Sequence, residues 1–241
     1  MDYFYTPPHL IARDLLVIEG DEFTHLTHVM RKNVGDTLRV VDGTGIAYDA
    51  EVTSLEKRAA RCKIREKHIR LNEPEIDMTL AVGLPKNAAK FDFLIEKTTE
   101  LGVSSVIPLL TERTIPRHAR VERWEKLALA AMKQSCRCMV PKVCHPMTFT
   151  NFVLATHKSS LRVIFHEKAD MPFQALTPDS TQHQHVPAVT ICIGPEGGFS
   201  DDEVELATTA GFIPVNLGAR RLRTETAAIV SVAALMLWRS G

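Results

Sequence analysis

The chain has 241 residues, enough for one large domain or two modest ones, and a chain of this length folds without disulfide or metal cross-links. Hydrophobic residues make up 45% and charged residues 24%, the balance of an ordinary globular protein, which excludes disordered, collagen-like and coiled-coil chains. The 29 basic and 29 acidic residues cancel, so a nucleic-acid partner would have to bind a local basic patch.

The N-terminus holds prolines and an aspartate where a secretory signal has a basic stretch followed by a long apolar run. The longest apolar run, residues 227–238, is too short to span a bilayer and predicts a buried helix. Five cysteines, an odd number in a chain without an export signal, indicate reduced thiols. We therefore expect a cytoplasmic protein without a membrane segment.

Cys136, Cys138, Cys144 and His145 bring potential zinc ligands into one short stretch. Zinc-binding cysteine pairs usually have two to four residues between them, whereas Cys136 and Cys138 have one. Near the end of a predicted helix, side chains two positions apart point away from each other. The pattern therefore favours structural cysteines over a zinc site, and we expect no metal.

The first 72 residues are rich in predicted strands. Residues 37–41 form a short strand, and a glycine-containing turn leads into an alternating strand at residues 46–55. Residues 59–69 are a further candidate strand, and a short helix is expected near residues 21–31. Small strands at such close spacing predict a small barrel.

The pattern of predicted secondary structure changes after residues 72–75, which we take as a domain boundary. Strands then alternate with helices: strands are expected at 76–83, 103–110, 161–165, 189–193 and 212–217, and helices at 88–101, 121–138, 201–210 and 225–238. Apolar strands alternating with helices predict an α/β domain with a parallel sheet covered on both faces. The expected domains are residues 1–72 and 73–241.

The predicted helix at 121–138 has one basic face. Arg123, Lys126, Lys133 and Arg137 fall within about 80° of one another, and the opposite face is apolar. A stripe of like charge on a single helix is more often a solvated surface than a binding site. The competing interpretation is a site for a polyanion such as a nucleic-acid backbone.

A glycine-rich loop at residues 193–200 joins a predicted strand to a helix. Ser200 and Glu203 form a capping box that marks the start of the helix. The spacing lacks the nucleotide-binding patterns, and Glu196 together with the acidic first turn of the helix would repel a phosphate. A neutral or cationic ligand fits better, and a purely structural tight turn is the alternative.

A second loop, residues 217–227, also leaves a predicted strand and enters a helix. Arg220, Arg221 and Arg223 lie just before this nearly apolar helix. Such charges are costly unless the guanidiniums reach solvent, a carboxylate or an anionic ligand. Two such loops on successive strand ends predict one crevice at the carboxyl edge of the sheet.

Both loops resemble the signature loops of the SPOUT superfamily of S-adenosylmethionine-dependent RNA methyltransferases. More closely, the chain resembles the RsmE family of 16S ribosomal RNA (uracil-N3)-methyltransferases. Residues 194–203 match the family pattern G-P-E-G-G-[FL]-[ST]-x-x-E in full, and residues 217–227 match L-G-x-R-x-L-R-x-E-T-A in full. Weaker matches, such as K-T-T-E-L-G-V at residues 97–103, extend the resemblance over nearly the whole chain. Met30, Glu96 and Lys133 depart from the residues that the family usually has.

The resemblance implies a PUA-like, RNA-binding β-barrel followed by a SPOUT-type parallel sheet with a C-terminal trefoil knot. It also implies a homodimer that binds S-adenosyl-L-methionine in the knot. The implied cofactor-binding residues are Phe165, His166, Glu167, Ile193, Gly194, Pro195, Glu196, Gly197, Gly198, Leu217, Gly218, Arg220, Leu222, Arg223, Thr226 and Ala227. The candidate RNA-binding residues are Arg31, Lys86, Lys90, Arg123, Lys126, Lys133 and Arg137.

The implied reaction moves a methyl group from the donor to N3 of a specific uridine in 16S ribosomal RNA of the small subunit. The base must be unpaired, and its N3 loses a proton. We expect Arg223 to stabilise the resulting negative charge and Glu225 either to accept the proton or to hold Arg220 or Arg223. His166 is a weaker candidate acceptor.

Three other functions stay open at this point. The fold could methylate another RNA, or it could bind RNA without catalysis. The glycine loops could also serve a small-molecule nucleotide enzyme, which would bind ATP or NAD.

Overall fold

The computed structural model describes residues 3–115, 119–156, 161–176 and 188–238. The chain forms two compact units, Met1–Glu73 with Leu129–Val140, and Pro74–Ala128 with Pro141–Gly241. The sequence placed residues 129–140 in the second domain, whereas in the structure this segment packs with the first unit. The reason is tertiary, because apolar residues of the segment are buried against the N-terminal strands.

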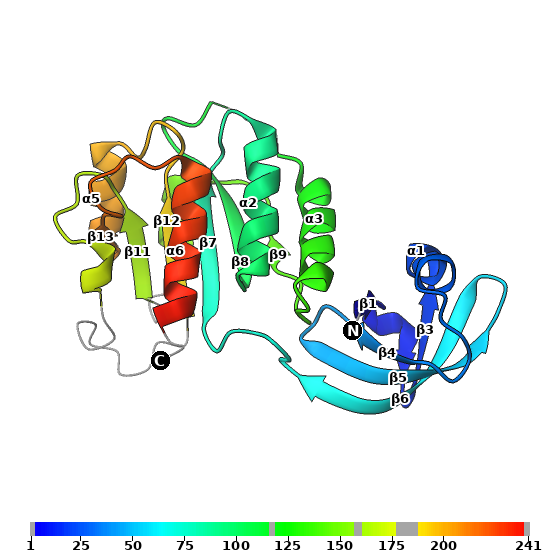
Figure 1. The fold of residues 1–241 in the computed structure, drawn as a ribbon. Coiled ribbons are helices and arrows are strands. Elements are labelled where there is room, and N and C mark those ends of the chain that lie inside the picture. Colours follow the sequence, from blue (N-terminus) through cyan, green and yellow to red (C-terminus); the bar gives the residue numbers. More distant parts are fainter. Residues whose placement is uncertain (1–2, 116–118, 157–160, 177–187, 239–241) are drawn as a thin grey trace. The chain divides into compact units, whose positions relative to one another are not determined.

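The N-terminal unit is built on one six-stranded sheet in the order β1-β4-β5-β6-β3-β2, in which β1 and β4 are parallel and the other neighbours antiparallel (Figure 1). Its elements are β1 (Tyr3–Tyr5), a 3-10 turn (Pro8–Leu10), β2 (Ile11–Ala12), β3 (Leu15–Glu19), α1 (Gly20–Thr24), a π-helical turn (His25–Val29), β4 (Thr37–Val41), β5 (Ile46–Leu55) and β6 (Ala59–Ile69). The strands expected at 37–41, 46–55 and 59–69 are confirmed. The helix expected at 21–31 is split into α1 and the π-helical turn.

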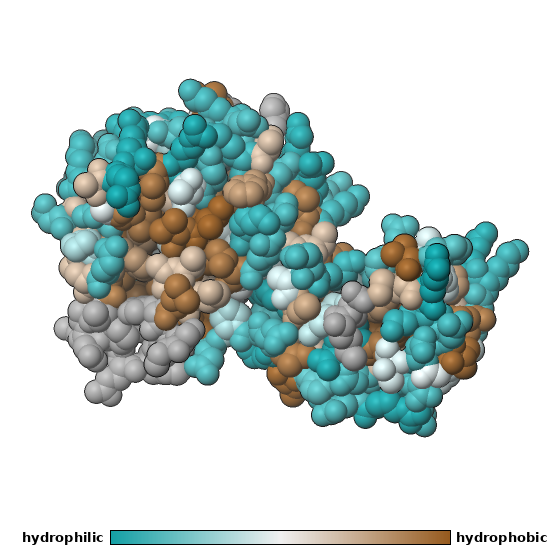
Figure 2. Space-filling view, viewed as in Figure 1, coloured by the Kyte–Doolittle hydropathy of each residue, from teal (hydrophilic) through white to brown (hydrophobic). Residues whose placement is uncertain are grey.

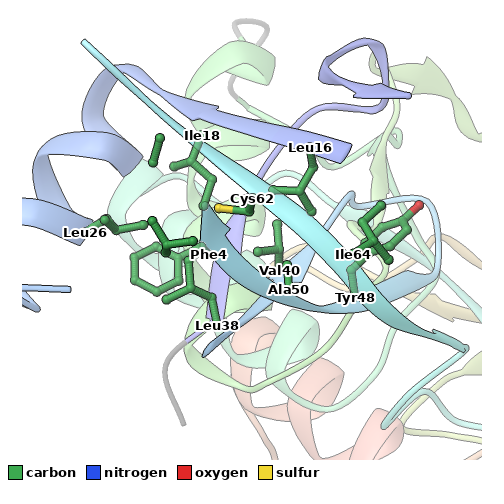
Figure 3. Packing of buried hydrophobic residues seen from close by; sticks show 12 residues of the cluster. Phe4, Leu16, Ile18, Leu26, Leu38, Val40, Tyr48, Ala50, Cys62 and Ile64 are labelled. Atoms are coloured by element: carbon green, nitrogen blue, oxygen red, sulfur yellow. The ribbon is translucent and has the colours of Figure 1, made fainter. Parts of the chain in front are cut away.

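The core of this unit follows from the pleat of the strands. Successive side chains of a strand point to opposite faces, so alternate residues of β4, β5 and β6 are buried together. Figure 3 shows this packing; the buried cluster comprises Phe4, Leu16, Ile18, Leu26, Leu38, Val40, Tyr48, Ala50, Val52, Ala60, Cys62 and Ile64. The sheet order has two ends, β1 and β2, so the described pairings do not themselves close the expected barrel.

α3 (Val121–Gln134) ends four residues earlier than the sequence predicted. Cys136 has a φ of 57°, a left-handed conformation that terminates helical hydrogen bonding. The chain beyond it turns toward Glu73, which accepts hydrogen bonds from the backbone amides of Cys138 and Met139. Cys138 is buried in an apolar cluster with Val41.

The second unit carries a seven-stranded sheet in the order β10-β8-β7-β12-β11-β13, with β9 also paired to β8, and every described pairing is parallel. Its elements are β7 (Asp77–Gly83), α2 (Ala88–Glu100), β8 (Ser105–Leu110), the first half of α3, β9 (Lys142–Val143), β10 (Met147–Thr148), α4 (Phe149–Ala155), β11 (Leu161–Phe165), a 3-10 turn (Phe173–Ala175), β12 (Ala188–Ile193), α5 (Asp201–Thr209), β13 (Ile213–Val215) and α6 (Thr224–Trp238). The expected parallel sheet and its alternating helices are confirmed. α4, β9 and β10 were not predicted.

Helices pack against this sheet on apolar side chains. α4 and α5 cover a cluster that includes Ala81, Ile164 and Cys192 from three neighbouring strands. α6 packs on β7 and β12, with α2 beside it (Figure 1). None of the helices in the described parts of the chain is long and apolar enough to cross a membrane.

Candidate active site

A pocket of about 340 Å³ lies where β11, β12 and β13 end. Because the three strands are parallel neighbours, the loops that follow them meet at one edge of the sheet. The pocket is lined by Arg113, Phe165, His166, Glu167, Lys168, Ile193, Gly194, Pro195, Glu196, Gly197, Gly198, Phe199, Asp201, Asn216, Leu217, Gly218, Arg220, Arg221, Leu222, Arg223, Thr224 and Ala227. The crevice expected from the two loops is therefore present, and the loop after β11 adds a third wall.

The pocket gathers every residue expected to bind the cofactor except Thr226. Thr226 is exposed in the first turn of α6, while its neighbour Ala227 lines the pocket. The three wall-forming segments are separated by as many as about fifty residues of sequence, and the parallel register of the sheet brings their ends together.

Two glycines set the shape of the loop after β12. A Cβ on Gly194 would lie 3.0 Å from the Cα of Gly198, so a side chain there would force the loop open. Gly198 has a φ of +69°, a left-handed conformation in which glycine carries no steric penalty. Its amide donates a hydrogen bond to the carbonyl of Pro195 at 2.8 Å, which closes the turn.

Three residues outside the expected site hold the pocket loops together. The hydroxyl of Thr224 donates to the carbonyl of Gly194 at 3.1 Å and joins α6 to the glycine loop. Asn216 donates through its side chain to the carbonyl of Ala169 and accepts from the amide of Gly218. Arg113, from the segment after β8, donates to the carbonyl of Gly197. An asparagine two residues before a glycine and a threonine at a helix start are weak signals; nothing local marks Arg113.

The acidic groups of the pocket already have partners. Asp201 lies 3.1 Å from the ammonium of Lys168, whose hydrogen bond and charge lower the pKa of that carboxyl. Glu196 accepts hydrogen bonds from the backbone amide of Lys86. Glu167 lies 3.9 Å from Arg221. Glu196 and Asp201 therefore repel an anion less than the sequence predicted, because a backbone amide faces one carboxylate and an ammonium the other.

Arg223 and Glu225 lie in different surroundings. Arg223 is exposed and lines the pocket. Glu225 is buried, with one carboxylate oxygen 3.5 Å from the ammonium of Lys90 on α2 and the other without a hydrogen-bond partner among the described residues. Glu225 does not appear in the lining of the pocket. The structure thus pairs Glu225 with Lys90 and not with Arg220 or Arg223, the partners expected from the sequence.

The residues expected to bind RNA fall into distinct environments. Arg31 in the first unit is exposed, as are Lys86 and Lys126 in the second. Arg123 is exposed but bonds the carboxylate of Asp92 at 2.8 Å. These side chains remain available to an anionic partner from solvent.

Two members of the expected basic stripe are ion-paired with carboxylates of the first unit. Lys133 is ion-paired with Glu22. The predicted RNA-binding role of Arg137 is wrong. This residue is only 2% exposed, and its guanidinium bonds the equally buried carboxylate of Glu73 at 2.6 Å. The end of α3 at Gln134 moves Arg137 off the helix face on which the sequence placed it.

One cluster with metal-ligand chemistry occurs in the residues that the structure describes. Ligand atoms of Asp49, Glu66 and His68 lie within 4.8 Å of one another on β5 and β6. The guanidinium of Arg39 already bonds Asp49 at 2.5 Å, and His68 bonds the same carboxylate at 2.9 Å. These contacts form an ion-pair network in which the arginine supplies the positive charge. Cys138, weighed above as a zinc ligand, donates its thiol to the carbonyl of Leu71.

Comparison with known proteins identifies the family of this chain. A model of the RNA methyltransferase domain matches residues 72–236, and one of the RNA methyltransferase PUA domain matches residues 18–65. The ribosomal RNA small subunit methyltransferase E of Buchnera aphidicola is 32% identical over 90% of this chain and 85% of its own length. The chain belongs to the ribosomal RNA small subunit methyltransferase E family. The family member from Synechocystis is 34% identical over 94% of this chain and 74% of its own length.

Solved structures agree over the whole chain. The ribosomal RNA small subunit methyltransferase E from Neisseria gonorrhoeae, bound to S-adenosyl methionine, has a TM-score of 0.84 and 31% identity over 99% of this chain and 98% of its own. A putative methyltransferase from Legionella pneumophila, in complex with the same cofactor, has a TM-score of 0.82 and 28% identity over 98% and 96%. This chain is thus an RNA methyltransferase, with a catalytic domain and a PUA domain.

Proposed function

We propose that the protein transfers a methyl group from S-adenosyl-L-methionine to N3 of a uridine in 16S ribosomal RNA of the small subunit. The observation that carries the proposal is the meeting of both motif-bearing loops, residues 194–203 and 217–227, in one pocket of a methyltransferase E family chain. The relatives are named for the small-subunit RNA, and two similar structures hold this cofactor.

The pocket suits the cofactor in shape. A Cβ placed on Gly198 or Gly218 would meet no heavy atom within 4 Å, so the main chain is open to close approach by a ligand. We propose the pocket-lining members of the sequence-predicted set as cofactor-binding residues, together with Asn216 and Thr224, which hold the loops. When bound, the cofactor supplies an electrophilic methyl group on a sulfonium.

The chain's own residues prepare the acceptor. A uridine must be unpaired and turned into the pocket before N3 can face the donor. Transfer of the N3 proton to water leaves negative charge on the base oxygens, and the exposed guanidinium of Arg223 lines the pocket and can stabilise it. Glu225 contacts Lys90 instead of the pocket, so we assign it to positioning the first turn of α6. Proximity alone contributes much of the rate in such a transfer.

The RNA backbone requires positive charge outside the pocket. We propose that Arg31, Lys86, Arg123 and Lys126 contact phosphates, because all four are exposed. Lys90, Lys133 and Arg137 are left out of this role, since none of the three is exposed and each is ion-paired with a carboxylate.

We further propose a homodimer through α6 and a trefoil knot formed by the pocket loops. Hydrophobic side chains gather over the region of α6 in Figure 2, and on this helix Val230 is 41% and Leu237 67% exposed. An apolar helix face of this kind calls for burial, which a second copy provides. Ribosomal RNA as the substrate implies that the reaction takes place in the cytoplasm.

The deciding experiment incubates the protein with labelled S-adenosylmethionine and either unmodified small subunits or naked 16S ribosomal RNA. The expected product is N3-methyluridine at a single position, identified by nuclease digestion and mass spectrometry. If the protein binds RNA without transferring label, it is a non-catalytic RNA-binding protein. If the label appears on another RNA, that RNA is the substrate.

Calorimetry separates the remaining alternative. The protein is expected to bind S-adenosylmethionine and S-adenosylhomocysteine and to show no heat with ATP or NAD. Binding of ATP or NAD alone would support a nucleotide enzyme built on the same glycine loops.

A further inference from the structure

A short turn after β8 is fastened to the start of α5. The amide of Thr111 donates to the hydroxyl of Thr114 at 3.0 Å, and the amide of Thr114 donates to the carbonyl of Thr111 at 3.1 Å. Within this turn, the amide of Glu112 donates to one carboxylate oxygen of Glu203 at 2.9 Å. The other oxygen accepts from the amide of Ser200 in the capping box of α5. The carboxylate of Glu203 thereby joins the turn to the start of α5, directly after the glycine loop.

Arg113, at the centre of this turn, reaches the glycine loop with its side chain. Its Nη1 donates to the carbonyl of Gly197 at 2.7 Å. The stem lies flat on the same residue, because a Cβ added to Gly197 would be 3.3 Å from both Cβ and Cδ of Arg113. The side chain also lines the pocket. It therefore touches both the loop and the space in which we place the cofactor.

The peptide that Arg113 contacts lies between two glycines, Gly197 and Gly198. No Cβ restricts its rotation from either side, so the loop sequence alone permits several orientations. In the structure both ends of this peptide are held: its carbonyl by Arg113 and its N–H by the carbonyl of Pro195. The contact with Pro195 belongs to the loop itself, whereas Arg113 is a restraint from outside it.

We propose that Arg113 is a positioning residue for donor binding, which holds the Gly197–Gly198 peptide in the orientation that accepts S-adenosylmethionine. The proposal rests on the function proposed above. Without the guanidinium, the peptide samples other orientations and only a fraction of the molecules is competent to bind. The apparent dissociation constant then rises by the inverse of that fraction.

The first test replaces Arg113 by methionine, which keeps the apolar stem and removes the donor. Loss of one charge-assisted hydrogen bond predicts about a tenfold rise in the dissociation constant for S-adenosylmethionine, measured by calorimetry. In steady-state assays KM for the donor rises by the same factor, while kcat and KM for RNA stay near the parental values. Arg120→Met is the matched control, because it removes an exposed guanidinium from the same connection that makes no hydrogen bond to the loop among the described residues.

Two further variants, Arg113→Lys and Gly197→Ala, test the same contact in case Arg113→Met folds poorly. Arg113→Lys retains a donor and is expected to bind S-adenosylmethionine more tightly than Arg113→Met. Gly197→Ala places its Cβ against the Arg113 stem and should also weaken binding. In Gly197→Ala combined with Arg113→Met, the loss of binding should be smaller than the sum of the two single losses, because both changes act on the same contact.

Three results would overturn the inference. They are unchanged donor affinity in Arg113→Met, a lysine variant no better than methionine, and a rise confined to KM for RNA, which would make Arg113 an RNA contact. Binding of S-adenosylmethionine to the parental protein distinguishes failure of this inference from failure of the proposed function. If the parental protein does not bind S-adenosylmethionine, the proposed function fails. If it binds and Arg113→Met binds equally well, only the role of Arg113 fails.

Discussion

Arg223 and Glu225 are two residues apart, yet only the arginine side chain lines the pocket. Arg223 is exposed there, and no ion pair holds its guanidinium among the residues that the structure describes. Glu225 is buried against α2 through Lys90. Arg223 precedes α6, which begins at Thr224, whereas Glu225 lies in the first turn of the helix and faces Lys90 on α2. Their expected effects on the reaction therefore differ.

Arg223→Ala should lower methyl transfer at least about a hundredfold, because it removes a charge placed where negative charge develops on the base. The unfolding midpoint should stay unchanged, since the side chain is exposed. Initial rates with labelled donor and a thermal melt measure the two effects. Arg221→Ala, in the same loop and 3.9 Å from Glu167, is the comparison and should lose less. Full activity in Arg223→Ala would remove this residue from the mechanism.

Glu225→Gln should keep transfer within about tenfold of the parental rate, because a group that contacts Lys90 is not the proton acceptor. A general base would lose about a hundredfold or more and would flatten the dependence of kcat on pH. The pH profile of kcat for the glutamine variant decides between these outcomes. Lys90→Met tests the other half of the pair and should have an effect of similar size.

At the scale of elements, the end of α3 changes the role of its basic residues. The helix stops at Gln134, and the next residues turn inward to Glu73. The carboxylate of Glu73 accepts from Arg137 and from two backbone amides, so it is fully used although it is buried. Sequence periodicity extended the helix to residue 138 because no glycine or proline marks its end.

Arg137→Met should lower the free energy of unfolding by about 3–5 kcal/mol, because it leaves the buried carboxylate of Glu73 without its countercharge. Chemical denaturation measures this loss. In Arg137→Met, the slope of log affinity for RNA against log salt concentration should equal that of the parental protein. In Lys126→Glu, this slope should be smaller. If Arg137→Met is as stable as the parental protein but shows a smaller salt dependence of RNA binding, Arg137 contacts RNA, as the sequence predicted.

The N-terminal sheet should lose stability in alkaline solution. Burial, together with a hydrogen bond to Asp42, raises the pKa of Tyr48 from 10.0 to about 12. The neutral phenol is favoured in the folded state, so its contribution is complete below pH 10 and is lost as the pH rises toward 12. Absorbance titration of the phenolate and denaturation on both sides of pH 10 test this.

Tyr48→Phe is the control for that experiment, and it should show a shallower alkaline loss. Burial also raises the pKa of Cys62 to about 12, so part of the loss should remain in the phenylalanine variant. An unchanged alkaline profile in Tyr48→Phe would show that Tyr48 titrates normally in the folded protein.

For the whole molecule, the uncovered face of α6 determines the expected assembly. Leu237→Asp should convert the proposed dimer into a monomer, because it places a charge in an apolar interface. Sedimentation at several concentrations measures the oligomeric state. Leu154→Asp is the matched control: Leu154 is 75% exposed on α4 and should leave assembly unchanged. A parental monomer at all concentrations would contradict the proposal.

Much of this molecule follows from local pattern. Residues 37–41 and 46–55 alternate in hydropathy, and the structure has strands with those bounds. Ser200 and Glu203 predicted the start of α5, and their reciprocal hydrogen bonds are present. Strands in the second half are mostly apolar because helices cover them, and the parallel sheet was inferred from that property. α4 was missed because it is short and carries no periodic pattern.

By itself, the amino-acid sequence determined the two kinds of sheet, the strand-to-helix loops and the family to which they belong, because periodicity, turn residues and motifs are local properties. Only the tertiary structure decided that Arg137 is buried, that Glu225 faces Lys90 and that Arg113 reaches the glycine loop. These contacts join residues between 64 and 135 positions apart in the chain. Such partners are selected by the packing of whole elements, and no pattern within a single segment contains that information.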